Sequence, residues 1–206
     1  MNKFIYSSEL IQDNLEEMWS SISLSSFIEG KQWYWIAHTI AQDMADTYNV
    51  PIEVAVGVTS SLSPQKSWEH NIELAKEFFE TEGKRVRHTG AISAKARLIY
   101  KYYKGYSDRK AFIERVLNGP KIVSFFNNIL NPYDKSYCCI DTHMISICTG
   151  YSKLNRITDK QYNFLSKEVI KFATNNNMIP CEIQGILWTE YRKAKNENNR
   201  KHKLEN

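Results

Sequence analysis

The sequence predicts an all-α fold, and three observations carry that prediction. Apolar residues recur every three to four positions along most of the chain, as they do over residues 31–48. Capping side chains or proline precede several of these segments, and a glycine follows one of them. The valines of residues 53–62 stand at every second position, which would also allow a strand. Because that segment is nearly continuously apolar, we predict a buried helix there as well.

The first part of the chain is predicted to hold helices joined by polar turns. An amphipathic stretch of indefinite extent covers residues 14–26 and ends at Ser25 or Ser26. The helix over residues 31–48 precedes the apolar helix over residues 53–62. Further helices are expected at 68–79, 91–103 and 107–117, the last with Ser107 as its N-cap.

The second part of the chain continues this pattern. We predict helices over residues 122–130, 142–149, 158–175 and 180–195. Gly150 is suited to end the second of these helices, Thr158 to cap the third, and Pro180 to stand in the first turn of the fourth. Residues 196–206 are too polar to pack and are predicted to form a basic disordered tail.

Composition favours a chain with a sizeable core. Of the 206 residues, 42% are hydrophobic, which suits one domain or one domain with lobes. No apolar stretch reaches the ~20 residues that span a bilayer, and the N-terminus lacks the features of a signal peptide. We therefore expect a soluble intracellular protein with no membrane partner.

The four cysteines are expected to be reduced thiols. Cys138, Cys139, Cys148 and Cys181 all lie in apolar sequence, and two of them are adjacent, which does not suit a disulfide framework. A metal site built from Cys138, Cys139 and His143 is conceivable, but their spacing is poor for metal binding. We expect no metal and no organic cofactor.

Charge is distributed unevenly along the chain. Residues 1–80 hold 4 basic and 12 acidic side chains, whereas residues 81–121 hold 11 basic and 3 acidic ones. Residues 122–191 are balanced, and residues 192–206 hold 6 basic and 2 acidic side chains. Clustered Lys and Arg are what a phosphate backbone attracts. The alternative is a solvated helix face followed by a polar chain end.

Lys121 and Asp141 each stand at the predicted start of a helix. A helix over residues 122–130 carries the chain roughly 14 Å away from Lys121, at about 1.5 Å per residue. Residues 131–134 are typical of a turn, and an extended segment over 136–140 would bring the chain back by roughly 16 Å. The sequence therefore predicts an amine and a carboxylate side by side at two helix N-termini.

That pair suits chemistry at a sugar carbon. Breaking an N-glycosidic bond develops positive charge on the sugar, which a fixed carboxylate such as Asp141 can stabilise while it orients water. The amine of Lys121, if its pKa were lowered, could instead attack that carbon and form a Schiff base. The alternatives are that Asp141 is only an N-cap and that Lys121 is a phosphate contact or a solvated side chain.

These segments resemble the helix-hairpin-helix DNA glycosylase superfamily, the endonuclease III class. In that class a glycine-containing hairpin leads to a lysine or its replacement, as Leu117-Asn118-Gly119-Pro120-Lys121 does here. A Val/Ile-Asp-Thr-His segment then carries the catalytic Asp, as Ile140-Asp141-Thr142-His143 does here. The resemblance implies two helical lobes with a cleft between them, within one domain over residues 1–195. A lobe of roughly residues 54–140 would be inserted between the N- and C-terminal helices.

Two upstream segments extend the resemblance to roughly residues 54–150. Ser63-Pro64-Gln65 resembles the turn that leads to a residue filling the gap left by an extruded base. Residues 89–96 resemble the segment, with its lysine at Lys95, that opens the next helix. The Trp33-Tyr34 start and the late Gln184-x-x-x-Trp188 pattern are similar to those of small phage proteins.

The resemblance implies DNA as the partner, either a duplex with an extruded base or a single strand. It assigns catalysis to Asp141 and Lys121. Nucleic-acid contacts are assigned to Gln65, Lys66, Ser67, Lys95, Gly119, Ser124 and His143. The base pocket is assigned to Trp33, Tyr34, Trp68, Gln184 and Trp188. The alternatives are core packing for the aromatic residues and an ordinary turn or helix face for the polar ones.

The chain departs from the family pattern at two places. The usual hairpin is Leu-Pro-Gly-x-Gly-x-Lys, whereas residues 117–121 are two residues shorter and lack the second glycine. Pro120 also removes an amide that such a turn could have directed at a phosphate. The four closely spaced cysteines of an iron–sulfur loop are absent, so we expect a phage-type member without that cluster.

Three functions from different classes are compatible with these residues. The first is a hydrolytic DNA glycosylase acting on a damaged or modified base, in DNA repair or DNA modification, with or without lyase activity. The second is a glycosylase-fold transferase that flips a thymine-type base of phage DNA and modifies its exocyclic group. The third is a DNA-binding protein without chemistry. We expect the first, as a monomer in the cytoplasm, or in the host cytoplasm if the protein is phage-encoded.

Overall fold

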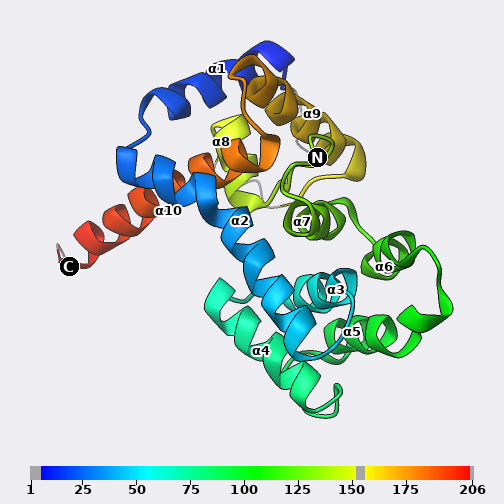
Figure 1. Cartoon of the computed structure of the whole chain (residues 1–206). Coiled ribbons are helices and arrows are strands. Elements are labelled where there is room, and N and C mark those ends of the chain that lie inside the picture. The colour runs from blue at the N-terminus through cyan, green and yellow to red at the C-terminus, as the bar shows by residue number, and fades with distance from the viewer. Residues whose placement is uncertain (1–5, 152–155, 205–206) are drawn as a thin grey trace. The chain divides into compact units, whose positions relative to one another are not determined.

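The computed structural model describes residues 6–151 and 156–204, with side chains as far as Asn196. Within these ranges it contains ten α-helices, one 3-10 turn and no strand (Figure 1), which confirms the all-α prediction. The helices are α1 (Ser8–Ser20), α2 (Leu24–Thr47), α3 (Ile52–Leu62), α4 (Trp68–Glu80), α5 (Gly90–Tyr102), α6 (Arg109–Leu117), α7 (Pro120–Leu130), α8 (Thr142–Thr149), α9 (Asp159–Asn175) and α10 (Pro180–Leu204), with the 3-10 turn at Tyr103–Gly105.

Contacts divide the chain into two compact units. Unit 1 combines Met1–Tyr34 with Tyr133–Asn206, and unit 2 is the continuous segment Trp35–Pro132. Helix α2 therefore begins in unit 1 and ends in unit 2. We expected a central lobe over roughly residues 54–140, and unit 2 both begins and ends earlier than that lobe.

Unit 1 is built from α1, α8, α9 and α10 around one apolar core. Ile11 and Leu15 of α1 are fully buried, and they lie one helical turn apart on the face that contacts α8 and α9. Helix α8 is buried from Met144 to Thr149. As predicted, Gly150 ends α8, in a left-handed conformation, and Thr158 caps α9, where it also forms a capping box with Gln161.

The first part of α2 packs against α10 in unit 1 with their backbones in contact. A Cβ added at Gly30 would overlap the backbone of Gly185 and Ile186, and one added at Gly185 would overlap the carbonyl oxygen of Gly30. Glu190 accepts hydrogen bonds from the Ser23 amide at 3.0 Å and the Ser23 hydroxyl at 2.7 Å. Only glycine permits so close a crossing at these two positions.

Unit 2 is arranged around α3. Every residue from Val54 to Leu62 is buried, and α4, α5, α6 and α7 all contact this helix. The strand that the alternating valines would have allowed does not form. A helix surrounded by other helices needs apolar residues on every face, which explains the loss of helical periodicity in this segment.

Several predicted boundaries were wrong. The stretch over residues 14–26 is interrupted at Ser21, where α1 ends, and α2 starts at Leu24 rather than at 31. Asp108, not Ser107, caps α6, because its side chain accepts the Ala111 amide. Helix α10 continues to Leu204, beyond the predicted end at residue 195, and residues 196–204 contain neither glycine nor proline.

Candidate functional site

Three hydrogen bonds fix Asp141 at the start of α8. Its Oδ1 atom accepts from the backbone amides of His143 and Met144, both at 2.9 Å, and thereby caps the helix. Its Oδ2 atom accepts from the indole Nε1 of Trp188 on α10, also at 2.9 Å. The half-buried carboxylate therefore has a defined orientation. Its capping role is confirmed, and its catalytic role stays a prediction.

The segment that leads to Asp141 is fixed by α9. The Tyr162 hydroxyl accepts from the Ile140 amide at 3.1 Å and donates to the Cys138 carbonyl oxygen at 3.0 Å. All three residues are buried. A buried polar group that loses its partner costs about 1–3 kcal/mol, so this pair of bonds holds the path of the chain into α8.

Aromatic rings surround Trp188, the donor to Asp141. The ring centroids of Trp33 and His143 lie 6.3 Å and 6.2 Å from that of Trp188, both tilted. The Arg192 guanidinium lies over the Trp188 ring at 4.5 Å. Trp33 and Trp188 of the predicted base pocket thus lie together in unit 1 with Asp141, the predicted catalytic residue, and His143, a predicted nucleic-acid contact.

The other two predicted residues of unit 1 are buried. Tyr34 packs edge-to-face on Trp33, with ring centroids 4.7 Å apart. Gln184 lies one turn before Trp188 on α10 and is 6% exposed. Its Oε1 atom has no hydrogen-bond partner within the described part of the chain. Leaving such an acceptor unpaired costs about 1–3 kcal/mol, so an apolar side chain at position 184 would stabilise the fold more than Gln184 does.

The arrangement in unit 1 suits the stabilisation of a developing positive charge. A carboxylate held by three donors needs no reorganisation when charge develops near it. The faces of Trp33, His143 and Trp188 are surfaces on which a planar base could stack. Unit 1 therefore combines a fixed anion with aromatic side chains.

Unit 2 contains the predicted turn before α4. The Lys66 amide donates to the Ser63 carbonyl oxygen at 3.2 Å, Pro64 occupies the second position, and Gln65 has a φ of 62°. This is the pattern of a type II turn, in which glycine usually occupies the position of Gln65. The Gln65 side chain is exposed, and its left-handed backbone costs about 1–3 kcal/mol.

Two residues after this turn have structural contacts. Ser67 caps α4, because its hydroxyl accepts from the His70 amide at 3.3 Å. Trp68 is half-buried and meets Phe125 edge-on, with ring centroids 6.4 Å apart. These contacts give Ser67 and Trp68 roles in the fold, and their predicted contacts with DNA or a base stay predictions.

A tight turn joins α6 to α7. Asn118 and Gly119 both have positive φ, at 48° and 120°. The Nζ of Lys95 donates a hydrogen bond to the carbonyl oxygen of Leu117, the last residue of α6. A cation at the C-terminal end of a helix also interacts favourably with the helix dipole. The lysine that the resemblance assigned to nucleic acid thus contacts the hairpin itself.

Lys121 and Asp141 belong to different units. Lys121 is exposed in the first turn of α7 in unit 2, and Ser124 one turn further is buried. Asp141 lies in unit 1. The predicted meeting of the amine with the carboxylate stays a prediction.

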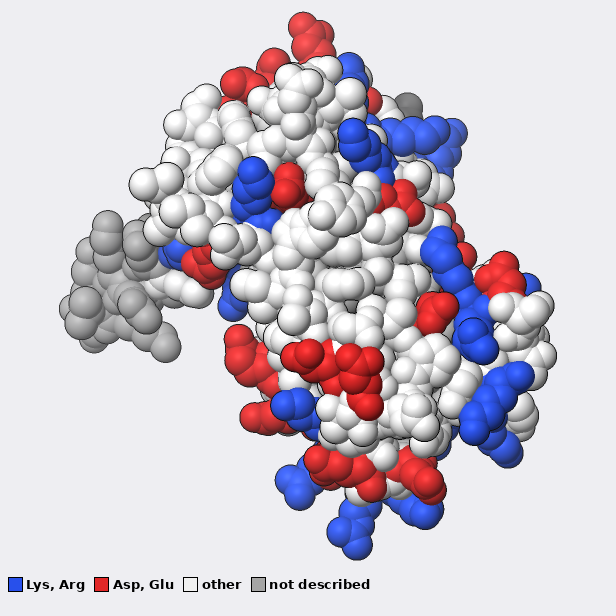
Figure 2. Space-filling model, in the orientation of Figure 1, with Lys and Arg blue, Asp and Glu red and all other residues white. Residues whose placement is uncertain are grey.

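Charged side chains of both signs occur on unit 2. Figure 2 shows Lys and Arg over the region of α5 and α6, with some acidic side chains beside them, and a mixture of acidic and basic side chains over the region of α4. This agrees with the excess of basic residues in segment 81–121. The α5–α6 side of unit 2 is therefore the part of this face best suited to a phosphate backbone.

The four cysteines are free and buried. Burial raises the pKa of Cys148 and of Cys181 to about 12, and it raises the pKa of Cys138 well above its usual value. A thiol that stays protonated at neutral pH is a poor nucleophile. Among the described residues, no cluster of three or more His, Cys, Asp or Glu side chains is placed to hold a metal ion.

Sequence reasoning missed Tyr162 and Arg192. Arg192 follows Trp188 by one helical turn, so helix periodicity could have placed its guanidinium beside the indole. Tyr162 gave no such signal, because its partners lie more than twenty residues earlier in the chain.

Over the described ranges, no helix has both the length and the apolar character needed to cross a bilayer.

Comparison with known proteins gives a family. A family model, described as a family of unknown function, matches residues 3–195. No curated protein and no solved structure matches the chain significantly. The matched range covers all of unit 2, most of unit 1 and every candidate site residue, so the chain belongs to the family of unknown function DUF7178.

Proposed function

We propose that this protein is a DNA base glycosylase-like enzyme, which extrudes a damaged or modified base and cleaves its N-glycosidic bond. The observation that carries the proposal is the Asp141 carboxylate, capped onto α8 and bonded to the Trp188 indole at 2.9 Å. A fixed anion beside aromatic faces suits a reaction in which positive charge develops on a sugar next to a planar base.

Each residue of this site has a role in the proposal. Asp141 stabilises the positive charge on the sugar and orients the attacking water. Trp188 holds the carboxylate, and its ring together with those of Trp33 and His143 offers faces on which the base stacks. Gln184 reads an edge of the base through its amide, whose carbonyl oxygen has no partner among the described residues.

Unit 2 supplies contacts to DNA in this proposal. The basic segment 81–121 attracts the phosphate backbone. The exposed Gln65, in a strained turn, fills the gap left by the extruded base. The tight turn between α6 and α7 supports a helix-hairpin-helix arrangement, and Lys121 at its end assists catalysis. No cofactor takes part in this hydrolysis.

Mass spectrometry of reaction products tests the proposal. The protein is incubated with bacterial and phage genomic DNA that contains natural modified bases, and small molecules and DNA are analysed separately. We expect the wild type to release a free base and the Asp141→Asn variant to release none while it still binds DNA. Asparagine keeps an oxygen that can cap α8 but removes the charge that stabilises the sugar.

A matched control separates loss of charge from damage to the fold. Asp134→Asn alters a second aspartate that accepts a hydrogen bond from a backbone amide, that of Ser136 at 2.9 Å, whereas the Trp188 indole donates to Asp141. This variant should release base at the wild-type rate. Equal activity of wild type and Asp141→Asn would contradict the role of Asp141.

The same experiment distinguishes the alternative functions. DNA that gains mass only with an added co-substrate would identify a transferase, and bound but unchanged DNA would identify a binding protein.

Lys121 is tested by covalent trapping. If Lys121 forms a Schiff base with the sugar, borohydride should link wild-type protein to DNA, and Lys121→Ala should abolish the link. A link that persists in Lys121→Ala would remove Lys121 as the nucleophile. Base release without any link would indicate direct attack by water.

A further inference from the structure

Arg192 carries an exposed guanidinium beside the candidate site of unit 1. It follows Trp188 by one turn of α10, and its guanidinium lies 4.5 Å from the centroid of the Trp188 ring. The same indole donates a hydrogen bond to Asp141 at 2.9 Å. One aromatic ring therefore contacts both a cation and the carboxylate to which we assign catalysis.

The positive charge of Arg192 is not neutralised within the described part of the chain. Asp141 already accepts from two backbone amides and the indole, and Glu190 accepts from the amide and the hydroxyl of Ser23 on α2. Among the described residues, Arg192 has no ion pair beyond its contact with the indole. It is also the first residue of segment 192–206, which holds 6 basic and 2 acidic side chains. Its charge is therefore available to an anionic ligand.

The contact with Trp188 holds the guanidinium in place without using its hydrogen-bond donors. A guanidinium that lies over an aromatic face can still donate from its edge, and two of these donors match the spacing of two phosphate oxygens. The ring also restricts a long side chain before any ligand binds, which lowers the entropy lost on binding. Arg192 is therefore better prepared to bind a phosphate than a freely rotating surface arginine.

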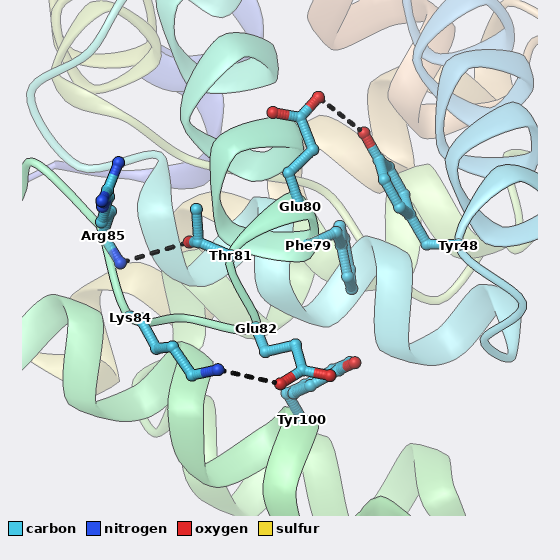
Figure 3. Close-up of a pocket in the computed structure, with 8 residues that line it drawn as sticks. All are labelled: Tyr48, Phe79, Glu80, Thr81, Glu82, Lys84, Arg85 and Tyr100. Atoms are coloured by element: carbon cyan, nitrogen blue, oxygen red, sulfur yellow. Dashed lines mark hydrogen bonds and ion pairs between the residues drawn. The ribbon is translucent and has the colours of Figure 1, made fainter.

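Two exposed arginines of unit 2 lack this combination of contacts. In Figure 3 the side chain of Arg85 extends away from the three aromatic rings drawn there, and among the described residues only its backbone amide is hydrogen-bonded. Arg115 lies over the Tyr106 ring at 6.0 Å, but that ring stacks on Phe112. Of these three arginines, only Arg192 contacts a ring that also binds a carboxylate.

The arrangement around Trp188 corresponds to the arrangement of groups in a nucleotide. In the proposed reaction Asp141 lies beside the sugar carbon that carries the base, and the base stacks on aromatic faces. The phosphates of that nucleotide are attached to the same sugar, a few bonds away from that carbon. Arg192 is separated from Asp141 by one indole ring. Its guanidinium is therefore within reach of such a phosphate.

From these observations we propose that Arg192 binds a phosphate directly next to the extruded nucleotide. This inference rests on the proposed function, since it takes Asp141 as the group at the sugar. The guanidinium donates two parallel hydrogen bonds to the phosphate while it stays over the Trp188 ring. The contact fixes the nucleotide backbone beside Asp141, in addition to any contacts that the basic segment of unit 2 makes with the rest of the DNA.

Neutral phosphate analogues test this contact one position at a time. The probe is a duplex oligonucleotide with a stable tetrahydrofuran abasic nucleotide, which offers no base to cleave. The phosphate on its 5′ or its 3′ side is replaced by an uncharged methylphosphonate, and dissociation constants are measured by fluorescence anisotropy. We expect one replacement to weaken wild-type binding by about tenfold, the effect of losing one charged hydrogen-bond partner. Arg192→Gln should bind the unmodified probe about tenfold more weakly than wild type and be insensitive to that replacement.

Control variants separate a phosphate contact from a structural role. Arg85→Gln and Arg115→Gln are matched controls, because both remove an exposed arginine of unit 2, and both should keep the wild-type sensitivity to the replaced phosphate. Arg192→Lys retains the charge without the paired donors and should keep part of that sensitivity. If Arg192 only supported Trp188, Arg192→Gln would bind every probe more weakly and stay as sensitive as wild type, which would overturn the proposal. Wild-type protein insensitive to both replacements would overturn it too.

Base release distinguishes a failure of this contact from a failure of the proposed function. Coupling between Arg192 and one phosphate, in a protein that releases no base, would confirm the contact and contradict the glycosylase. Base release by the wild type without such coupling would support the glycosylase and reject the contact.

Discussion

The Asp141 carboxylate uses both of its oxygens, one for the α8 amides and one for the Trp188 indole. The backbone part of this arrangement was predictable, since an aspartate before an apolar helix is a common N-cap. The indole bond was not predictable, because it depends on how α8 and α10 pack. Sequence therefore identified the residue, and tertiary contacts define its orientation.

Gln184 provides a test in which stability and function should change in opposite directions. Gln184→Met keeps the length of the side chain and removes an unpaired buried acceptor, so we expect the free energy of unfolding to rise by about 1 kcal/mol. If Gln184 reads the base, the same variant should release base more slowly. Denaturant unfolding and base release measure the two effects.

Thr189→Val is the matched control for Gln184→Met. The Thr189 hydroxyl is also unpartnered among the described residues and 4% exposed on α10, but it lies about 140° around the helix from Gln184. The Thr189→Val variant should stabilise the fold without any effect on base release. A Gln184→Met enzyme as active as wild type would remove Gln184 from the base pocket.

Gln65 is a second residue whose backbone conformation is unfavourable for its type. Gln65→Gly should raise the free energy of unfolding by about 1 kcal/mol, because glycine adopts the observed φ of 62° without strain. Loss of the side chain should weaken binding to DNA that has a gap in its base stack. Thermal unfolding and titration with an abasic duplex check the two effects. Unchanged affinity would assign Gln65 to the turn alone.

At the scale of helices, the sequence predicted elements better than their ends. Caps were correct where a single residue acts on its own helix, Thr158 through its side chain and Gly150 through its left-handed backbone. They were wrong where neighbouring residues compete, as Ser107 and Asp108 do for the start of α6. The close crossing of α2 and α10 left no signal, because a single glycine in each helix looks like an ordinary weak position.

That crossing predicts a large effect from a small substitution. Gly185→Ala places a methyl group against the Gly30 carbonyl oxygen, so the helices must separate, and we expect a loss of about 2–3 kcal/mol in the free energy of unfolding. Gly90→Ala is the control, because a Cβ at Gly90 meets nothing within 4 Å. It should be neutral or stabilise α5 by up to about 1 kcal/mol. Chemical denaturation of both variants makes the comparison, and equal stability would contradict the close crossing.

For the whole molecule, the uneven distribution of charge is the property most directly read from sequence. Segments 1–80 and 81–121 differ in sign, and Figure 2 shows Lys and Arg over the region of α5 and α6. The division into Trp35–Pro132 and the remainder was less accessible. The boundary could not be predicted because it falls within α2, a continuous helix that contributes to both units, and the sequence of an unbroken helix carries no sign of a boundary.

Salt dependence of DNA binding tests the role of the basic segment. Lys101→Gln should weaken DNA binding and lower the slope of log affinity against log salt by about 0.9, the value for one phosphate contact. Lys31→Gln, from the acidic N-terminal segment, is the matched control, since both lysines are exposed and lie over an aromatic ring, at 5.1 Å and 5.7 Å. Equal slopes for the two variants would exclude Lys101 as a phosphate contact.

The interrupted course of unit 1 along the chain bears on how the protein is made. During synthesis, Trp35–Pro132 leaves the ribosome before α8, α9 and α10 exist, so unit 2 can fold while translation continues. Helix α1, by contrast, must wait for its partners α8 and α9. The apolar residues Ile11 and Leu15 stay uncovered for that interval. A nascent chain stalled once Pro132 has left the ribosome should therefore contain a protease-resistant centre preceded by a sensitive N-terminal segment.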